Sequence, residues 1–246
     1  MATERLLKKA PTLALVVAGA GYGTRLEAGR PKQYVSLLGI PMLQRTLDVL
    51  GQCPEVDAMV VVVNEPCVEY CETELVEERI PKVIQVVAGG EERALSVRNG
   101  LAALVQAGRW DFVGIHDGAR PLVTCEEVAR TVEALAAGER LAGAVTGIPS
   151  TDTIKVVDEN GVVTATPDRR IIWRAQTPQI FRWDALMDAY AETPEDELLR
   201  STDDASLVEA RGGEVIMVKG SAENFKITDR VDMRHAEQIL AERRRD

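Results

Sequence analysis

The sequence predicts an α/β fold with a mostly parallel central sheet and helices on both of its faces. Short apolar runs alternate along the chain with segments of helical spacing, which is typical of strand–helix–strand units with right-handed crossovers. The runs are hydrophobic throughout, as expected for strands that are covered on both faces. The expected strands are 13–18, 58–63, 83–87, 112–115, 142–148 and 215–218.

Helical composition or spacing fills much of the chain between and after these strands. The expected helices are 42–50, 68–78, 94–106, 126–137, 183–192, 203–210 and 229–243. Thr228 stands just before the last of them. A threonine in that position favours the N-terminal cap of a helix, so we expect Thr228 to cap this one.

The strand–helix rhythm breaks at residues 149–172. Two β-prone runs, 153–157 and 162–166, flank the tetrapeptide Asp-Glu-Asn-Gly at 158–161. Asn-Gly between such runs is a strong signal for a hairpin, and we expect a β-arm that projects from the body of the protein. Because no internal repeat or low-complexity linker interrupts the chain, residues 1–246 are predicted to form a single domain with this arm.

Composition disfavours several classes of protein. The chain has 246 residues, 46% hydrophobic and 28% charged, which excludes a disordered or fibrous protein. A net charge of −10 and an aromatic content of 4% disfavour a nucleic-acid partner. No run approaches the ~20 apolar residues of a membrane span, and the apolar run 13–20 is too short for a convincing signal peptide. We therefore expect a cytoplasmic protein with no membrane partner.

The four cysteines are Cys53, Cys67, Cys71 and Cys125. None of them forms a C-x-x-C pair, and Cys67 and Cys71 lack a second pair of potential ligands. This spacing does not favour a metal site. In a chain of this size with so few cysteines, disulfides are not expected either.

A loop of small residues follows the first expected strand. It reads AGAGYGTR over 18–25 and is followed by Pro31 and Lys32. Small residues let backbone N–H groups approach phosphate oxygens, and Arg25 and Lys32 stand where they could clamp a triphosphate. The glycines alone are equally compatible with a flexible turn. The segment is neither a dinucleotide fingerprint, because Thr24 replaces the last glycine, nor a P-loop, because Gly-Lys-Ser/Thr is absent.

Asp117 follows another expected strand. The carboxyl edge of an open parallel sheet is where ligands bind. One carboxylate, completed by phosphate oxygens and water, suits Mg²⁺, and this makes Asp117 the candidate metal ligand. A helix-capping role is the alternative. The neighbouring His116 is expected to pack or to form hydrogen bonds rather than to act as a base.

Eight segments in order resemble the 2-C-methyl-D-erythritol 4-phosphate cytidylyltransferases, a family of polyol-phosphate cytidylyltransferases. The first is the strand and loop that end in Arg25 and continue to Lys32. The others are GGEERALSV at 89–97, HDGARP at 116–121, DTIK at 152–155, DR at 168–169, TPQ at 177–179, TDDAS at 202–206 and NFKIT at 224–228. The matches cover nearly the whole chain.

The resemblance implies a Rossmann-like nucleotidyltransferase fold and a CTP-dependent reaction. In that reaction CTP and 2-C-methyl-D-erythritol 4-phosphate give 4-diphosphocytidyl-2-C-methyl-D-erythritol and pyrophosphate, a step of isoprenoid precursor biosynthesis. The resemblance also implies Mg²⁺ as cofactor and a homodimer formed through the β-arm, because in the family the arm reaches into the partner subunit.

Residue roles follow from the same resemblance. The catalytic residues would be Arg25, Lys32 and Lys226. The nucleotide would be bound by Ala18, Gly19, Ala20, Gly21, Gly23, Gly90, Glu91 and Ser96. The acceptor would be bound by Asp117, Arg120, Thr153, Arg169, Thr202 and Lys226, with Thr153 and Arg169 acting on the site of the partner subunit. Asp117 would also bind the metal.

Departures from the family pattern are modest. Gly19 stands where Ala is usual, Glu91 where Asp is common, and Asp204 in place of a frequent Glu. None of these removes a charge that the reaction needs. Two alternatives stay open. One is the same reaction on another polyol phosphate, such as ribitol 5-phosphate. The other is a non-catalytic nucleotide-binding protein of the same fold, which the retained basic and acidic residues disfavour.

Overall fold

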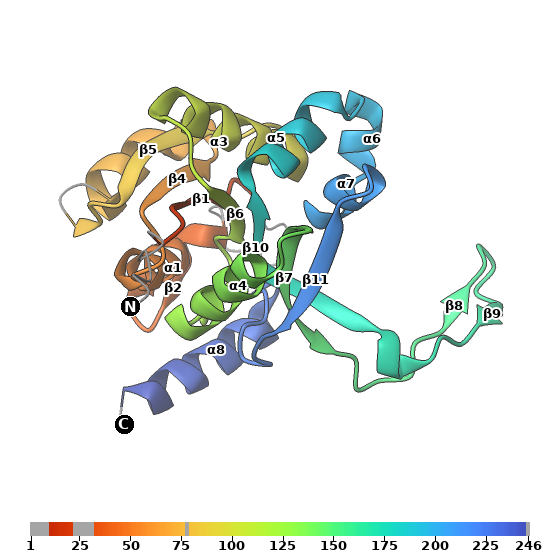
Figure 1. The fold of residues 1–246 in the computed structure, drawn as a ribbon. Coiled ribbons are helices and arrows are strands. Elements are labelled where there is room, and N and C mark those ends of the chain that lie inside the picture. Colours follow the sequence, from red (N-terminus) through yellow and green to blue (C-terminus); the bar gives the residue numbers. More distant parts are fainter. Residues whose placement is uncertain (1–9, 22–31, 77–78, 245–246) are drawn as a thin grey trace, which may run out of the picture.

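A seven-stranded sheet forms the centre of the computed structural model, which describes residues 10–21, 32–76 and 79–244 (Figure 1). The strand order is β11-β7-β10-β6-β1-β4-β5. These strands are β1 (Leu13–Gly19), β4 (Ala58–Val63), β5 (Val83–Ala88), β6 (Phe112–Asp117), β7 (Leu141–Pro149), β10 (Trp173–Arg182) and β11 (Glu214–Lys219). Of these, β10 is the strand that the sequence pattern did not predict.

The sheet is mostly parallel, as expected. β1 pairs in parallel with β4 and β6, β4 with β5, and β7 with β11. β10 runs antiparallel to both β6 and β7. The chain proceeds from β1 to β4 and β5 on one side and then crosses to β6 on the other. The strand order therefore reverses between β1 and β6, and such a switch point opens a crevice at the carboxyl ends of the strands.

Helices cover both faces of this sheet. α1 (Met42–Gln52) and α4 (Cys125–Ala137) pack on one face, and α3 (Arg93–Ala107), α5 (Trp183–Glu192) and α7 (Ala205–Ala210) on the other. Successive residues of β1 serve the two cores in turn, because strand side chains alternate between faces. Leu13 and Leu15 face α1, whereas Ala14 and Val16 face α3.

The remaining helices and turns complete the fold. α6 (Glu195–Arg200) lies beside α3, and α8 (Arg230–Arg243) packs over the small hairpin of β2 (Ser36–Leu37) and β3 (Ile40–Pro41). 3₁₀ turns span Lys32–Tyr34, Glu65–Cys67 and Arg169–Ile171. The helix expected at 68–78 is instead a short α2 (Val68–Tyr70) that continues as a π-helical segment at Cys71–Val76.

The cap of α8 differs from the expectation. The carboxylate of Asp229, not the hydroxyl of Thr228, accepts the N–H groups of Val231 and Asp232 and caps the helix. The Thr228 hydroxyl instead donates to the Asp232 carboxylate at 2.8 Å. Two neighbouring residues of capping type compete here, and Asp229 is the one in position to reach both free N–H groups.

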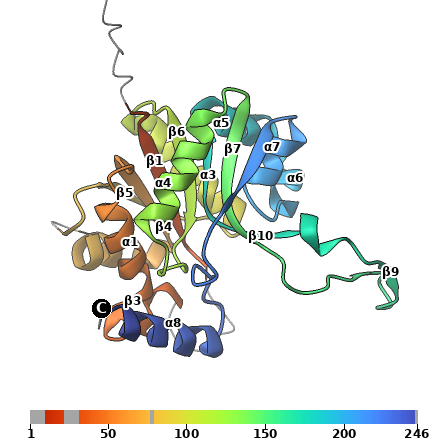
Figure 2. The ribbon, with the colours of Figure 1, turned by 60° about the horizontal axis from the view of Figure 1, so that its bottom comes forward.

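The β-arm projects from the body of the protein (Figures 1 and 2). Its tip is an antiparallel pair, β8 (Val156–Val157) and β9 (Val163–Ala165). The turn between them places Gly161 at φ +80°, a backbone conformation that glycine adopts readily. The hairpin predicted from Asn-Gly is therefore present, and its side chains are exposed.

The expectation for the cysteines was wrong in one respect. Cys53, at the end of α1, forms a disulfide with Cys125, at the start of α4, and their Cα atoms lie 4.9 Å apart. The pair arises because α1 and α4 pack on the same face of the sheet, which composition does not reveal. Cys67 and Cys71 are free thiols.

Over the part of the chain that the structure describes, no helix is long and apolar enough to cross a membrane. The cytoplasmic location expected from the sequence stays a prediction.

Candidate active site

Two adjoining cavities open at the carboxyl ends of β1 and β6. The first, of about 170 Å³, is lined by these residues of the expected nucleotide site: Ala18, Gly19, Ala20, Gly21, Gly90, Glu91 and Ser96. The second, of about 240 Å³, is lined by these residues of the expected acceptor site: Asp117, Arg120, Thr202 and Lys226. Three residues line both cavities, namely Arg93, Asp117 and Lys226.

Side chains hold each of the two loops that line the first cavity. The Ser96 hydroxyl accepts the Gly90 N–H at 3.1 Å, which holds the turn that leads into α3. The amide of Asn64 donates to the Ala20 carbonyl at 2.6 Å, which holds the loop after β1. A Cβ added to Gly89 would lie 2.5 Å from that of Ala20, so these loops approach closely only because residue 89 lacks a side chain.

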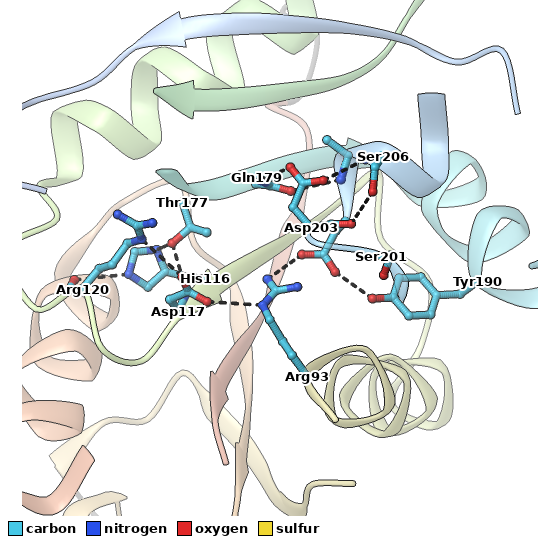
Figure 3. Close-up of polar contacts among 12 residues, drawn as sticks. Arg93, His116, Asp117, Arg120, Thr177, Gln179, Tyr190, Ser201, Asp203 and Ser206 are labelled. Carbon is cyan, nitrogen blue, oxygen red and sulfur yellow. Dashed lines mark hydrogen bonds and ion pairs between the residues drawn. The ribbon is translucent and has the colours of Figure 1, made fainter. Parts of the chain in front are cut away.

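Asp117 lies at the centre of a cluster of three cations, two of which, Arg93 and Arg120, are seen in Figure 3. Its Oδ2 is 3.1 Å from Lys226 Nζ and 3.3 Å from Arg120 Nε, and its Oδ1 is 3.5 Å from Arg93 Nε. Asp117 is only 6% exposed. Burial opposes its ionisation, but the charges of Lys226, Arg93 and Arg120 outweigh burial and hold the pKa of Asp117 well below its ordinary value. Asp117 is therefore a carboxylate at neutral pH.

A buried chain of hydrogen bonds supports Asp117 from behind. Its N–H donates to Thr177 Oγ1 at 3.0 Å, and Thr177 Oγ1 lies 3.1 Å from His116 Nδ1. His116 Nε2 lies 3.4 Å from the Arg120 carbonyl. The chain is satisfied when Nε2–H donates to that carbonyl and Nδ1 accepts from Thr177, an assignment made from the network.

His116 is fully buried, and burial lowers its pKa to about 4 against the opposing pull of Asp117. The imidazole is therefore neutral at pH 7. Because both ring nitrogens have hydrogen-bond partners in the protein, this geometry supports the expectation that His116 forms hydrogen bonds rather than acting as a base.

Arg120 and Lys226 are held close to each other by the loop that connects β11 to α8. Arg120 Nη1 donates to the Asn224 carbonyl at 2.8 Å, and the Asn224 amide donates to the Thr177 carbonyl at 2.9 Å. This links the loop that carries Lys226 to β10 and to the end of β6. Three segments far apart in the sequence thus place cations around one carboxylate.

Residues 13–242 match the family model described as 2-C-methyl-D-erythritol 4-phosphate cytidylyltransferase. The chain belongs to this family. A relative of that name from Geobacter metallireducens is 43% identical over 230 residues, which cover 93% of this chain and 97% of the relative. A relative of the same name from Geotalea uraniireducens is 44% identical over 226 residues, which cover 92% and 95% of the two chains.

Solved structures agree. 4-Diphosphocytidyl-2C-methyl-D-erythritol synthase from Anaerococcus prevotii superposes with a TM-score of 0.79 at 28% identity, covering 95% of this chain and 100% of that chain. The 2-C-methyl-D-erythritol 4-phosphate cytidylyltransferase from Thermus thermophilus superposes with a TM-score of 0.71 at 27% identity, covering the same shares. The family, the fold and the class of CTP-dependent nucleotidyltransferase expected from the sequence are thereby confirmed.

Some residues that the family resemblance assigns to the site are not among the described residues that line the two cavities. Gly23 and Arg25 lie outside the described residues, as does the side chain of Lys32. Thr153 and Arg169 stand on the projecting arm and are not among the described residues that line either cavity. Arg169 Nη1 donates to the Thr151 carbonyl at 3.1 Å.

The structure also adds residues that the sequence reasoning gave no role. Arg93 lines both cavities, and Gln33 lines the first. Thr177 and Gln179 line the second. Arg93, Thr177 and Gln179 fall within the segments 89–97 and 177–179 that carry the family resemblance, so the signal was present. Their contacts were not visible, because their partners are distant in the sequence.

A metal would have to bind through few protein ligands. Within the described residues there is no group of three or more His, Cys, Asp or Glu side chains that could hold a metal ion. Asp117 is an ionised carboxylate that lines both cavities. A single carboxylate of this kind fits Mg²⁺, which usually keeps several waters and takes its other ligands from substrate phosphates.

Proposed function

We propose that the two cavities of this cytidylyltransferase form one reaction chamber, with CTP in the first and 2-C-methyl-D-erythritol 4-phosphate in the second. The observation that carries the proposal is that Arg93, Asp117 and Lys226 line both cavities. A reaction that joins two phosphates needs their reacting atoms at one place, and charged groups must surround that place.

The first cavity suits the nucleotide. Reading cytosine requires an acceptor for its exocyclic amine and donors for its ring carbonyl. The backbone of 18–21, the Gly90 loop and the Ser96 hydroxyl offer groups of both kinds around the cavity. The glycines let the ligand approach the backbone closely.

The reaction needs positioning and charge neutralisation more than proton transfer. An oxygen of the acceptor phosphate attacks the α-phosphorus of CTP, a new P–O bond forms, and the bond to the β-phosphate breaks as pyrophosphate leaves with its electron pair. The attacking oxygen is already ionised, so no base is required. Lys226 and Arg120 would hold the acceptor phosphate, with Thr202 nearby, and Arg25 and Lys32 would neutralise the triphosphate.

Mg²⁺ is the proposed cofactor, and Asp117 is its proposed protein ligand. When bound, the ion would neutralise charge on the phosphates. Asp117 itself keeps Lys226 and Arg120 in place through contacts of 3.1 and 3.3 Å, which leaves the two cations facing the second cavity.

The β-arm supports the proposal that the enzyme is a homodimer with composite sites. Apolar side chains on the arm are 36–75% exposed, namely Ile154, Val156, Val157, Val162, Val163 and Ile171. Exposed strand edges are normally paired or covered, and a two-fold axis covers both arms at once because the interface is self-complementary. Thr153 and Arg169 would then bind the acceptor phosphate in the partner subunit's site.

A pyrophosphate-release assay tests the activity. CTP with 2-C-methyl-D-erythritol 4-phosphate is expected to give rapid release, and CTP with ribitol 5-phosphate little. A preference for ribitol 5-phosphate would establish the alternative acceptor, and no release with either would contradict the proposal.

A mixing experiment tests the composite site. Lys32→Ala and Arg169→Ala each inactivate the enzyme in this proposal. In a hybrid dimer that acts in trans, one site carries both lesions and the other carries none. After random subunit exchange, about a quarter of wild-type activity is expected to return, since half the dimers then hold one intact site of two. Exchange shown by mass spectrometry without any return of activity would mean that the arm acts within its own subunit.

A further inference from the structure

Arg93 occupies the wall between the two cavities. It is the first residue of α3, and its side chain is 31% exposed. The guanidinium therefore reaches from a rigid element to the place where the phosphates of the two substrates would meet. A cation there is useful only if it is held in one orientation, because an arginine side chain has many rotamers.

Besides Asp117, Arg93 contacts a second carboxylate, the buried side chain of Asp204. Arg93 Nη2 donates to Asp204 Oδ2 at 2.7 Å, and the Tyr190 hydroxyl donates to Asp204 Oδ1 at 2.7 Å. Asp204 is 0% exposed, and a buried charge of this kind persists only when it is paired and hydrogen-bonded. Among the described residues that line either cavity, neither Asp204 nor Tyr190 appears.

Asp204 is not needed to cap α7, the helix that it precedes. Its side chain makes no capping hydrogen bond. The preceding Asp203 caps the helix instead, because its Oδ1 accepts the Ser206 N–H at 3.1 Å. Its Oδ2 accepts a hydrogen bond from the Gln179 amide at 3.0 Å. The contacts of the Asp204 carboxylate are therefore directed at Arg93 and Tyr190.

The two ion pairs of Arg93 differ in length. The bond to Asp204 is short, at 2.7 Å, whereas the approach of Nε to Asp117 is 3.5 Å. A short, buried, charge-assisted bond fixes position, and a long contact at the cavity wall leaves the charge available to a ligand. Burial opposes the charge on Arg93, but Asp204 and then Asp117 outweigh it and raise its pKa, so it stays a cation.

We propose that Asp204 and Tyr190 are positioning residues that hold the Arg93 guanidinium between the nucleotide and acceptor cavities, where it neutralises phosphate charge during transfer. This inference rests on the proposed reaction chamber. It extends the chamber to a buried anchor formed by Tyr190 on α5 and by Asp204 just before α7, two side chains that line neither cavity.

The experiment compares steady-state kinetics of pyrophosphate release. Arg93→Gln is expected to lower kcat about 100-fold, as the loss of a charge contact in the transition state typically does. Asp204→Asn is expected to lower kcat about 10-fold and Tyr190→Phe about 3-fold, with smaller changes in KM for either substrate, because these groups act only through Arg93. Glu195→Gln is the matched control. Glu195 pairs at 3.0 Å with Arg98, which lies on α3 like Arg93, but this pair is exposed. The control is therefore expected to leave kcat unchanged.

A double-variant cycle separates positioning from general damage. If Asp204 acts through Arg93, Arg93→Gln with Asp204→Asn is no slower than Arg93→Gln alone, within about 2-fold. The inference would be overturned if the loss of kcat in the double variant equalled the product of the losses in the two single variants. It would also be overturned if Asp204→Asn and Tyr190→Phe both kept the kcat of the wild type. Tyr190→Phe decides the matter if Asp204→Asn does not fold. Asp117→Asn, measured alongside, distinguishes a failure of the proposed reaction chamber from a failure of the proposed anchor. Full activity of Asp117→Asn would contradict the reaction chamber itself. An inactive Asp117→Asn together with an unaffected Asp204→Asn would contradict only the anchor.

Discussion

Replacing Asp117 with Asn is expected to destabilise the fold as well as to abolish activity. The change preserves shape and removes one charge from a group that is 6% exposed and faces three cations. Removing one partner of a buried ion pair costs about 3–5 kcal/mol. Two facts place the expected loss below that, at about 2–3 kcal/mol after discounting for solvent. Arg93 and Lys226 are 31% and 36% exposed, and Arg120 keeps its hydrogen bond to the Asn224 carbonyl.

The assay is thermal unfolding followed by circular dichroism, without nucleotide or Mg²⁺. For a chain of this size, about 2–3 kcal/mol corresponds to a decrease of roughly 5–10 °C in Tm. Asp184→Asn is the matched control, since Asp184 pairs with Arg109 at 2.6 Å but the side chains are 63% and 69% exposed. The control is expected to change stability by less than about 1 kcal/mol. An Asp117→Asn variant with the Tm of the wild type would show that solvent already compensates the three cations, and would refute the reasoning.

Four further outcomes are expected. CTP supports turnover far better than ATP, GTP or UTP, and equal rates with a purine nucleotide would contradict the nucleotide assignment. Lys32→Ala lowers kcat about 100-fold with an unchanged circular dichroism spectrum; near-normal turnover would remove its catalytic role. Gly100→Ala lowers the urea midpoint, with a loss of about 1–2 kcal/mol, because its Cβ would lie 2.5 Å from Val16 Cγ1; an unchanged midpoint would show that α3 can shift. Cys71 is buried and its pKa is raised by burial to about 12, so a thiol reagent at pH 8 labels the partly exposed Cys67 first; equal labelling rates would indicate local opening.

Much of the fold can be predicted because its elements have strong local signals. The apolar run Ala58–Val63 is β4, with the bounds expected from the sequence, and Trp183–Glu192 is α5 as expected. The Asn-Gly turn likewise predicts the hairpin of the arm. β10 (Trp173–Arg182) escaped prediction because several of its residues are polar, so its composition does not resemble that of a buried strand. It becomes a buried strand because it pairs with β6 on one side and with β7 on the other.

In the candidate site, too, some features have a local signal in the sequence and others do not. The loops at 18–21 and 89–92 can be recognised in the sequence by their glycines, because backbone freedom is a property of glycine itself. The contact between Asp204 and Arg93 has no such local signal, because the two residues are 111 positions apart. The disulfide between Cys53 and Cys125 is similar, with 72 positions between its cysteines.

The sequence by itself determined the class of fold, the order of most elements and the family, because periodicity and turn chemistry depend on residues close together in the chain. Only the tertiary structure decided which charges meet. It buries Asp117 among three cations and keeps His116 neutral, and it places Arg93 between two cavities. Those properties depend on burial and on distances between side chains, and both are set when distant segments of the chain pack against one sheet.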